Sequence, residues 1–326
     1  MPRKTSVDAM REALRAELLR DERVVVIGED VKVGVFGGTR WLHREFGDER
    51  VINTPISELA VAGAGVGAAA TGIRPVIDLM FGTFLFLAFD QIANQAGAMR
   101  YMFGGQTKLP LVLMTVSGAG ISAGHHHSQP VHPMFMNMPL IKVVLPSTPY
   151  DVKGLLISAI RDDNPVLFLS PITLGSQRGE VPDDPYTIPL GEAAIRREGG
   201  DVTICTAGAM TRRCLEAARA MAREGIECEV IDLRTLKPWD EACVLRSVRK
   251  TGRFVAVDES FPVCGAASEW AATVAEKAFP HLRAPVQRVS NLDVPLPYSP
   301  VLEKAAVPTT ERILEALRRC MQTEAA

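Results

Sequence analysis

Short apolar runs alternate with segments of helical period along almost the whole sequence, and this alternation is the strongest constraint on the fold. In the first half, apolar runs typical of buried strands occur at residues 24–27, 76–80, 109–116, 142–145 and 165–169. Helical periodicity marks residues 57–71, 86–102 and 149–162, and Thr5-x-x-Asp8 predicts the start of a first helix. Strands that alternate with helices form an open, largely parallel sheet covered on both faces. The sequence therefore predicts an α/β fold.

A proline-rich stretch at residues 170–190 interrupts this alternation and is typical of a surface linker between domains. Beyond it, strands are expected at residues 202–206, 227–233, 254–257 and 286–289, and helices at residues 211–223, 239–249, 266–278 and 310–321. At about 100 to 200 residues per domain, a chain of 326 residues accommodates two domains. We expect one domain at residues 1–185 and a smaller α/β domain at residues 190–326, both rich in parallel sheet.

Composition excludes several classes of partner. The 36 Lys and Arg residues nearly balance the 38 Asp and Glu residues, so no strong electrostatic field favours nucleic acid or an anionic membrane. Residues 109–141 carry no charge, but their glycines, prolines and four histidines do not suit a lipid-facing helix and predict buried strand and loop. The six cysteines form no C-x-x-C pair, and no signal or transit peptide is visible at the start. We expect a reducing, cytoplasmic location.

A glycine-rich segment superficially resembles a dinucleotide-binding turn. Gly65, Gly67 and Ala70 have the spacing of that motif, but they lie inside a helical run instead of directly after a strand. The next acidic residue, Asp78, is also too near. Close helix packing is the simpler interpretation, and an NAD-binding dehydrogenase is disfavoured.

Glu58 is the only acidic residue between Arg50 and Asp78, and its neighbours are apolar. One interpretation is a first-turn glutamate that follows the N-cap residue Ser57 and interacts favourably with the helix dipole. The other is a buried carboxyl that shares a proton with a nitrogen atom of a ligand. These residues alone leave both interpretations open.

Four of the six histidines fall within one short segment, at His125, His126, His127 and His132. No carboxylate or cysteine lies nearby in the sequence to support a metal site, so zinc is disfavoured. Two interpretations remain: imidazoles that bond to the backbone of a polar loop, or an acid/base group working near neutral pH.

Several segments, in this order along the chain, resemble one enzyme family. They are Asn53–Glu58 (NTPISE), Phe89–Asn94 (FDQIAN), Tyr101–Gly105 (YMFGG), Gly118–Gly124 (GAGISAG) followed by His127-Ser-Gln129, Lys142–Asp151 (KVVLPSTPYD), Ala159–Pro165 (AIRDDNP), Gly225–Pro238 (GIECEVIDLRTLKP) and Asp293–Tyr298 (DVPLPY). The chain resembles the β subunit (E1β) of the thiamine-diphosphate-dependent dehydrogenases of pyruvate, branched-chain 2-oxo acids and acetoin, which are related to transketolase. The resemblance covers nearly the whole chain and favours the functional interpretation of Glu58.

This resemblance implies a thiamine diphosphate pyrimidine-binding domain followed by a transketolase C-terminal-like domain. By resemblance, Glu58 contacts N1′ of the aminopyrimidine, Phe84 packs on that ring, and His127 is the histidine of a His-Ser-Gln motif near the reacting centre. The implied activity is decarboxylation of a 2-oxo acid, or cleavage of acetoin, with transfer of the acyl group to lipoamide on a separate E2 protein. The segments at residues 89–91 and 101–105 resemble acetoin dehydrogenases somewhat more.

The resemblance also implies metals and partners. A structural potassium site corresponds to Leu111, Ala159, Ile160, Asp162 and Asn164, although Asp162 and Asn164 could equally be ordinary helix-ending residues. No Gly-Asp-Gly triplet, the family's Mg²⁺ motif, occurs in the sequence. We therefore expect the Mg²⁺ ligands to come from an E1α-like subunit in an α2β2 heterotetramer, and no tight cofactor binding by this chain alone. The C-terminal domain is expected to contact E2.

Three departures from the family pattern leave the substrate open. Ser170 stands where relatives usually carry an acidic residue, Pro130-Val131-His132 replaces an acidic residue after the His-Ser-Gln motif, and Met114-Thr115 replaces an arginine. The alternatives that remain are the C-terminal half of a split transketolase and a catalytically silent assembly subunit.

Overall fold

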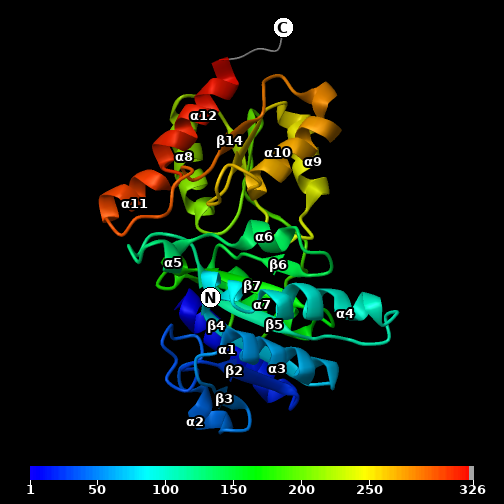
Figure 1. Ribbon diagram of the computed structural model, residues 1–326. Helices are drawn as coiled ribbons and strands as arrows, with labels where there is room; N and C mark the ends of the chain where they lie inside the picture. The colour runs from blue at the N-terminus through cyan, green and yellow to red at the C-terminus, as the bar shows by residue number, and fades with distance from the viewer. Residues whose placement is uncertain (323–326) are drawn as a thin grey trace. The chain divides into compact units, whose positions relative to one another are not determined.

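The expected alternation of strands and helices is present in the computed structural model, which describes residues 1–322 (Figure 1). Contacts divide the chain into two units. The first comprises residues 1–117 and 134–190, and the second comprises residues 118–133 and 191–326. Among the described residues, no helix is long and apolar enough to cross a membrane.

The first unit contains a parallel sheet in which the strands lie in the order β6-β7-β5-β4-β2-β3. These strands are β2 (Val24–Gly28), β3 (Val51–Asn53), β4 (Arg74–Phe81), β5 (Val112–Ser117), β6 (Lys142–Val144) and β7 (Val166–Pro171). The helical elements are α1 (Ser6–Arg20), α2 (Leu42–Phe46), α3 (Glu58–Ala70), η1 (Gly82–Phe86), η2 (Gln91–Ala96), α4 (Gly97–Met102), α7 (Pro149–Arg161) and η3 (Ile172–Leu174). The helix expected at residues 86–102 thus contains a π-helical stretch, η2.

Packing explains why these segments take their places. Thr5 and Asp8 cap α1 reciprocally, as the sequence predicts, and α1 packs against α7. The two helices share a core with the apolar strands β2 and β7, which are buried along their whole length because a parallel sheet of this kind is covered on both faces. Burial of this apolar surface supplies most of the stabilisation.

The proline-rich stretch at residues 170–190 is not the free surface linker that its composition suggests. Within it, β8 (Arg178–Glu180) pairs antiparallel with β1 (Arg3–Thr5). The side chains of Val181 and Ile188 are buried in the core of the first unit, and the buried Lys153 ammonium donates to the carbonyls of Pro182 and Asp183 at 2.6 and 2.8 Å. Because these contacts are not local in sequence, composition alone could not reveal them.

The second unit has a sheet in the order β14-β13-β10-β11-β9, parallel except for β9. The strands of this sheet are β9 (Ala194–Arg197), β10 (Val202–Thr206), β11 (Cys228–Asp232), β13 (Phe254–Val257) and β14 (Gln287–Val289), and the short strand β12 (Thr235–Lys237) lies outside it. The helices of the second unit are α8 (Met210–Arg223), α9 (Glu241–Thr251), α10 (Ala266–Lys277), η4 (Phe279–His281), α11 (Pro300–Ala306) and α12 (Thr310–Gln322). Figure 1 shows α8 and α12 side by side, and both contribute to the core of this unit.

The segment at residues 118–133 belongs to the second unit, whereas a boundary at residues 185–190 would place it in the first. It was expected to be loop, but it contains the short helix α5 (His125–Ser128) and the start of α6 (His132–Met136). Its Ala119 joins a small apolar cluster with Leu296, Ala306 and Val307. The histidines expected to matter for function are therefore attached to the second unit.

Candidate active site

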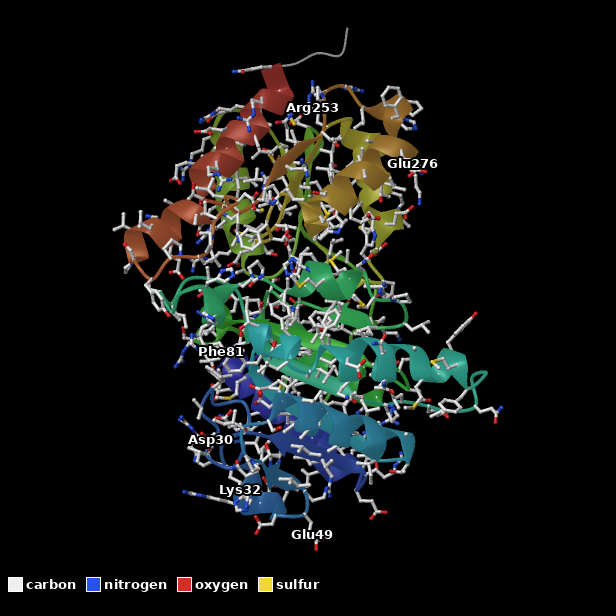
Figure 2. All side chains as sticks on the ribbon, in the orientation of Figure 1. Asp30, Lys32, Glu49, Phe81, Arg253 and Glu276 are labelled. Carbon is white, nitrogen blue, oxygen red and sulfur yellow. The ribbon has the colours of Figure 1, made fainter. Side chains whose placement is uncertain are left out.

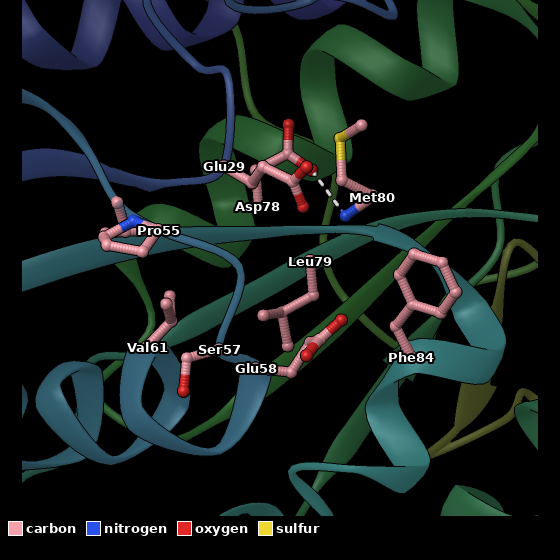
Figure 3. Close-up of a pocket in the computed structure, with 10 residues that line it drawn as sticks. Glu29, Pro55, Ser57, Glu58, Val61, Asp78, Leu79, Met80 and Phe84 are labelled. Carbon is pink, nitrogen blue, oxygen red and sulfur yellow. Dashed lines mark hydrogen bonds between the residues drawn. The ribbon is translucent and has the colours of Figure 1, made fainter.

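A small pocket in the first unit opens where β2 and β4 meet the amino end of α3 (Figure 3). Gly28 ends β2 and pairs with Asp78 in β4, so Glu29 and Asp78 come side by side at the carboxyl end of the strands. A Cβ atom on Gly28 would lie 2.3 Å from the Asp78 carbonyl oxygen, so only glycine permits this close approach. Ligands of open α/β sheets commonly bind at this end of the strands.

Glu58 is the first residue of α3, and its partly buried carboxylate lies between Leu79 and Phe84 in the pocket (Figure 3). Ser57 holds the N-cap position but makes no side-chain capping bond. The expected serine cap is therefore absent, although the amino end of a helix still favours a negative charge. The carboxylate of Glu58 is directed into the pocket that Phe84 also lines.

Two further carboxyl groups line the same pocket. Burial raises the pKa of Asp78 to about 6, the charge of Glu29 adds to the shift, and the hydrogen bond from the Met80 amide at 3.0 Å opposes it. Burial also raises the pKa of Glu29, helped by the charges of Asp30 and Glu58. Glu29, Glu58 and Asp78 are the ionisable residues that line the pocket, and none of its lining residues is Lys, Arg or His.

Glu29 and Asp78 are not among the site residues that the sequence predicts. The only local signal was an acidic residue directly after one apolar run and another inside the next. Nothing in such a pattern shows that the two strands are neighbours. The two carboxyls are half-buried, and a cluster of carboxyls with raised pKa values in a pocket indicates a functional site.

Phe84 is the aromatic residue that lines the pocket, and its ring belongs to a small group of packed aromatic rings. Phe81 contacts Phe36 edge to face at 5.2 Å between ring centroids, and Phe84 at 5.5 Å. Phe81 is labelled in Figure 2 at the end of β4. Phe84 lines the pocket together with Glu58, and a flat ring at this position offers a surface on which a second planar ring can stack.

An unsatisfied polar atom is also found here. Thr54 lines the pocket, and its hydroxyl is buried without a hydrogen-bond partner among residues 1–322. A buried hydroxyl left unpaired costs free energy, on the order of 1–3 kcal/mol. Together with the carboxyls, it indicates a place for a polar ligand that carries donor groups.

The histidines of the second unit have distinct partners. The His125 Nδ1 atom accepts a hydrogen bond from the Leu296 amide at 3.3 Å, and His127 Nδ1 lies 3.3 Å from the Ala123 carbonyl oxygen. His126 is exposed. In the described part of the chain, no group of three His, Cys, Asp or Glu side chains could hold a metal ion. The four imidazoles therefore do not form one cluster.

His132, one of the departures from the family pattern, is buried against Asp258. Its Nε2 atom lies 3.0 and 3.1 Å from the two carboxylate oxygens. Burial opposes ionisation of Asp258, but the charge of His132 and the hydrogen bond from it hold the pKa of that carboxyl below its usual range. Burial raises the pKa of the neighbouring Glu259 to about 7, against the hydrogen bond that it accepts from the Ala119 amide at 2.5 Å.

The residues matched to a potassium site lie in the first unit, around the end of α7 and the start of β5. The Leu111 carbonyl accepts from the Val166 amide at 2.8 Å, and the Ile160 carbonyl accepts from Arg74 Nε at 3.0 Å. The Asp162 carboxylate accepts from the Asn164 amide at 2.9 Å and forms an ion pair with Lys142. The donor set is therefore rich in oxygen, as an alkali cation prefers, and part of it already accepts hydrogen bonds from the protein.

Comparison with known proteins agrees with this architecture. Residues 3–175 match the pyrimidine-binding domain of transketolase, and residues 191–313 match the C-terminal domain of transketolase. A split-gene transketolase, solved as an inactive β4 tetramer, superposes with a TM-score of 0.81 at 24% identity over 98% of this chain and 99% of that chain. At that identity the superposition shows the fold alone.

Two curated relatives extend the similarity to sequence. The β subunit of acetoin:2,6-dichlorophenolindophenol oxidoreductase from Cupriavidus necator is 47% identical and covers 99% of each chain. The β subunit of the pyruvate dehydrogenase E1 component from Rickettsia felis is 42% identical and covers 96% of each chain. With two matching domains and full-length relatives at this identity, the chain belongs to the transketolase-like family of E1 β subunits of 2-oxo acid and acetoin dehydrogenases.

Proposed function

We propose that this chain is the β subunit of a dehydrogenase E1 component that cleaves a 2-oxo acid or acetoin with thiamine diphosphate and passes the acyl group to lipoamide on an E2 protein. The observation that carries the proposal is the pocket in which Glu58 lies opposite Phe84, with Glu29 and Asp78 beside it. Acetoin is the first substrate to test, because a 47% identical relative is named for it.

The pocket suits the aminopyrimidine end of the cofactor. It offers a flat ring at Phe84, an unpaired hydroxyl at Thr54 and a carboxyl at Glu58, which match a planar ring that carries nitrogen atoms and an amino group. When bound, thiamine diphosphate supplies the electron sink that makes cleavage of a carbon–carbon bond beside a carbonyl possible. Residues of this chain bind and orient its ring and set the protonation there.

Glu58 holds a proton at N1′ of the pyrimidine in this proposal. A carboxyl within hydrogen-bond reach of a ring nitrogen can share a proton with it. Phe84 packs on the ring and fixes its plane. The carboxylates of Glu29 and Asp78 give the pocket a negative electrostatic potential. This potential favours a nitrogen base as ligand over an anion.

The same negative potential supports the proposal that a partner subunit binds the diphosphate end of the cofactor. The lining residues include no cation that could neutralise a diphosphate, and the sequence contains no Gly-Asp-Gly triplet. A diphosphate requires bound Mg²⁺ or basic groups. We infer that an E1α-like subunit supplies the Mg²⁺ ligands in an α2β2 assembly, and that residues 190–326 form the domain that contacts E2.

All six cysteines are free thiols, five of them buried. This supports the proposed cytoplasmic location, where thiols stay reduced.

The first prediction tests the reaction. The chain is co-purified with its α partner and assayed with a panel of acetoin, pyruvate and branched-chain 2-oxo acids, using a redox dye as acceptor. We expect turnover of at least one of these substrates by the complex, and none by either subunit alone. Turnover only with ketose phosphate donors would replace the proposal by a split transketolase, and no turnover of any substrate would favour a silent assembly subunit.

Glu58→Gln should lower turnover in the complex by about two to four orders of magnitude, because the amide keeps the shape of the side chain but cannot share the proton. Thermal unfolding should change little, since the helix loses only a dipole interaction of about 0.3–1 kcal/mol. Glu49→Gln, on a residue exposed in Figure 2, is the matched control. Near wild-type turnover in the Glu58 variant would return this residue to a helix-end role.

His127→Ala should depress acylation of lipoamide by about tenfold or more beyond any loss in the dye assay. In the proposal, His127 offers a proton to the dithiolane sulfur as the lipoyl ring opens. The exposed neighbour His126 provides the control His126→Ala, which should leave both assays near wild type. A larger loss of lipoamide acylation in the His126 variant than in the His127 variant would contradict the role proposed for His127.

We also propose that Leu111, Ala159, Ile160, Asp162 and Asn164 bind K⁺, supported by the oxygen-rich donor set. If so, replacing KCl by choline chloride at equal ionic strength should lower the unfolding temperature of the complex by a few degrees, about 2–4 °C for roughly 1 kcal/mol lost in a chain of this size. Asp162→Asn should reduce that dependence on K⁺. Identical unfolding temperatures in both salts would reject the site.

A further inference from the structure

The backbone at residues 118–124, just before the histidines, has an uncommon conformation. Gly118, Gly120, Ser122 and Gly124 have φ values of +93°, +117°, +55° and +74°. Three of these residues are glycines, which adopt positive φ without strain, whereas Ser122 does not. Such alternation turns successive amide groups toward one side and makes a concave site for an anion.

A carboxylate of the same unit fills this concavity. Glu303 lies in α11 and is only 4% exposed. One carboxylate oxygen accepts from the Gly120 amide at 3.0 Å, and the other accepts from the Ser122 amide at 3.0 Å and the Ser122 hydroxyl at 3.1 Å. The Glu303 side chain therefore holds both Gly120 and Ser122, and Ser122 is the residue with the strained backbone. Hydrogen bonds to a charged acceptor are about twice as strong as neutral ones.

The turn leads directly to His127. Ser122, which Glu303 holds, precedes Ala123, and the Ala123 carbonyl oxygen lies 3.3 Å from His127 Nδ1. Which ring nitrogen of a histidine carries the proton is set by the hydrogen bond that the other nitrogen makes. A shift of the Ala123 carbonyl would therefore change both the orientation and the tautomer of the imidazole.

Other contacts fix the turn from the outside but do not reach Ser122. A Cβ atom on Gly124 would lie 2.4 Å from the Tyr298 ring, so the ring packs directly on the backbone there. Glu259 accepts from the Ala119 amide, and the Leu296 amide donates to His125. These contacts keep the segment folded when the hydrogen bonds of Glu303 alone are changed.

From this chain of contacts we propose that Glu303 is a positioning residue for His127. It acts through Ser122 and the Ala123 carbonyl and touches neither substrate nor cofactor. The inference rests on the proposed role of His127 in acyl transfer. It predicts that weakening the hydrogen bonds of Glu303 impairs that step while it spares the chemistry at Glu58.

The test uses Glu303→Gln in the assembled α2β2 complex. The amide keeps the size of the side chain, but its NH2 group replaces one of the two acceptor oxygens, so donors face donors at the turn. Lys304→Ala, on an exposed residue of the same helix, is the control. We expect acylation of lipoamide to fall about tenfold in the Gln variant with dye-linked turnover within about twofold of wild type, because small misplacements of a catalytic group have effects of this size. The control should match wild type in both assays.

Two further measurements separate positioning from general stability. Hydrogen exchange of the amides at residues 120–127 should be faster in Glu303→Gln and unchanged in Lys304→Ala. In a His127→Ala background, Glu303→Gln should add no further loss of acylation, because both changes act on one group. Since the Gln variant preserves the size of the side chain, the test does not depend on whether Glu303→Ala folds.

The outcomes also distinguish this inference from the function on which it rests. If His127→Ala lowers acylation but Glu303→Gln leaves hydrogen exchange unchanged, the inference alone is overturned. The inference would also be overturned if Glu303→Gln lowered lipoamide acylation, dye-linked turnover and the unfolding temperature together. If His127→Ala leaves acylation intact, the proposed role of His127 fails, and the inference fails with it.

Discussion

The parallel pairing of β2 with β4 is the contact on which the candidate site depends. Gly28 lies so close to Asp78 that any side chain at residue 28 would collide with the opposite backbone, and this approach brings Glu29 and Asp78 together. The amino end of α3 then adds Glu58 to the same pocket. Three carboxyls without a lining cation favour a protonated or neutral nitrogen ring and repel a diphosphate. This electrostatic character supports the proposal that a partner subunit supplies the cation for the diphosphate.

A second set of carboxylates organises the other unit. Asp258, Glu259 and Glu303 all bond to the segment at residues 118–133, through His132, the Ala119 amide and the turn at Gly120 and Ser122. Because that segment contains no Lys or Arg, backbone amides and an imidazole satisfy these buried acids. Buried charges are tolerated only when such partners are present. This arrangement also accounts for His132, a departure from the family pattern, because the imidazole has Asp258 as its partner.

Much of the fold could be predicted from the sequence, because the apolar runs are continuous. The strands at residues 202–206 and 254–257 have the predicted bounds, and most helices differ from prediction by one or two residues at an end. Short elements with mixed exposure, such as β3, β8 and β9, were not predicted, since three or four residues carry no clear period. The placement of residues 118–133 and the burial of Val181 and Ile188 depend on contacts far along the chain.

The site was predictable only in part. Glu58 and Phe84, which the resemblance to a family implies as site residues, line one pocket. The residues alone left two interpretations of Glu58 open, a helix-end role and a functional carboxyl. Glu29, Asp78 and Glu303 were missed, because their roles depend on strand pairing and on a turn more than 180 residues from Glu303. A single buried acid in a sequence does not reveal which backbone amides it will meet.

The most direct measurement of the central claim is a calorimetric titration of thiamine diphosphate with Mg²⁺ into the isolated chain, the isolated α partner and their complex. We expect tight, saturable binding by the complex and none of comparable affinity by this chain alone, because its pocket offers contacts for the ring but no cation for the diphosphate. Binding by the isolated, monomeric chain as tight as that of the complex would contradict it.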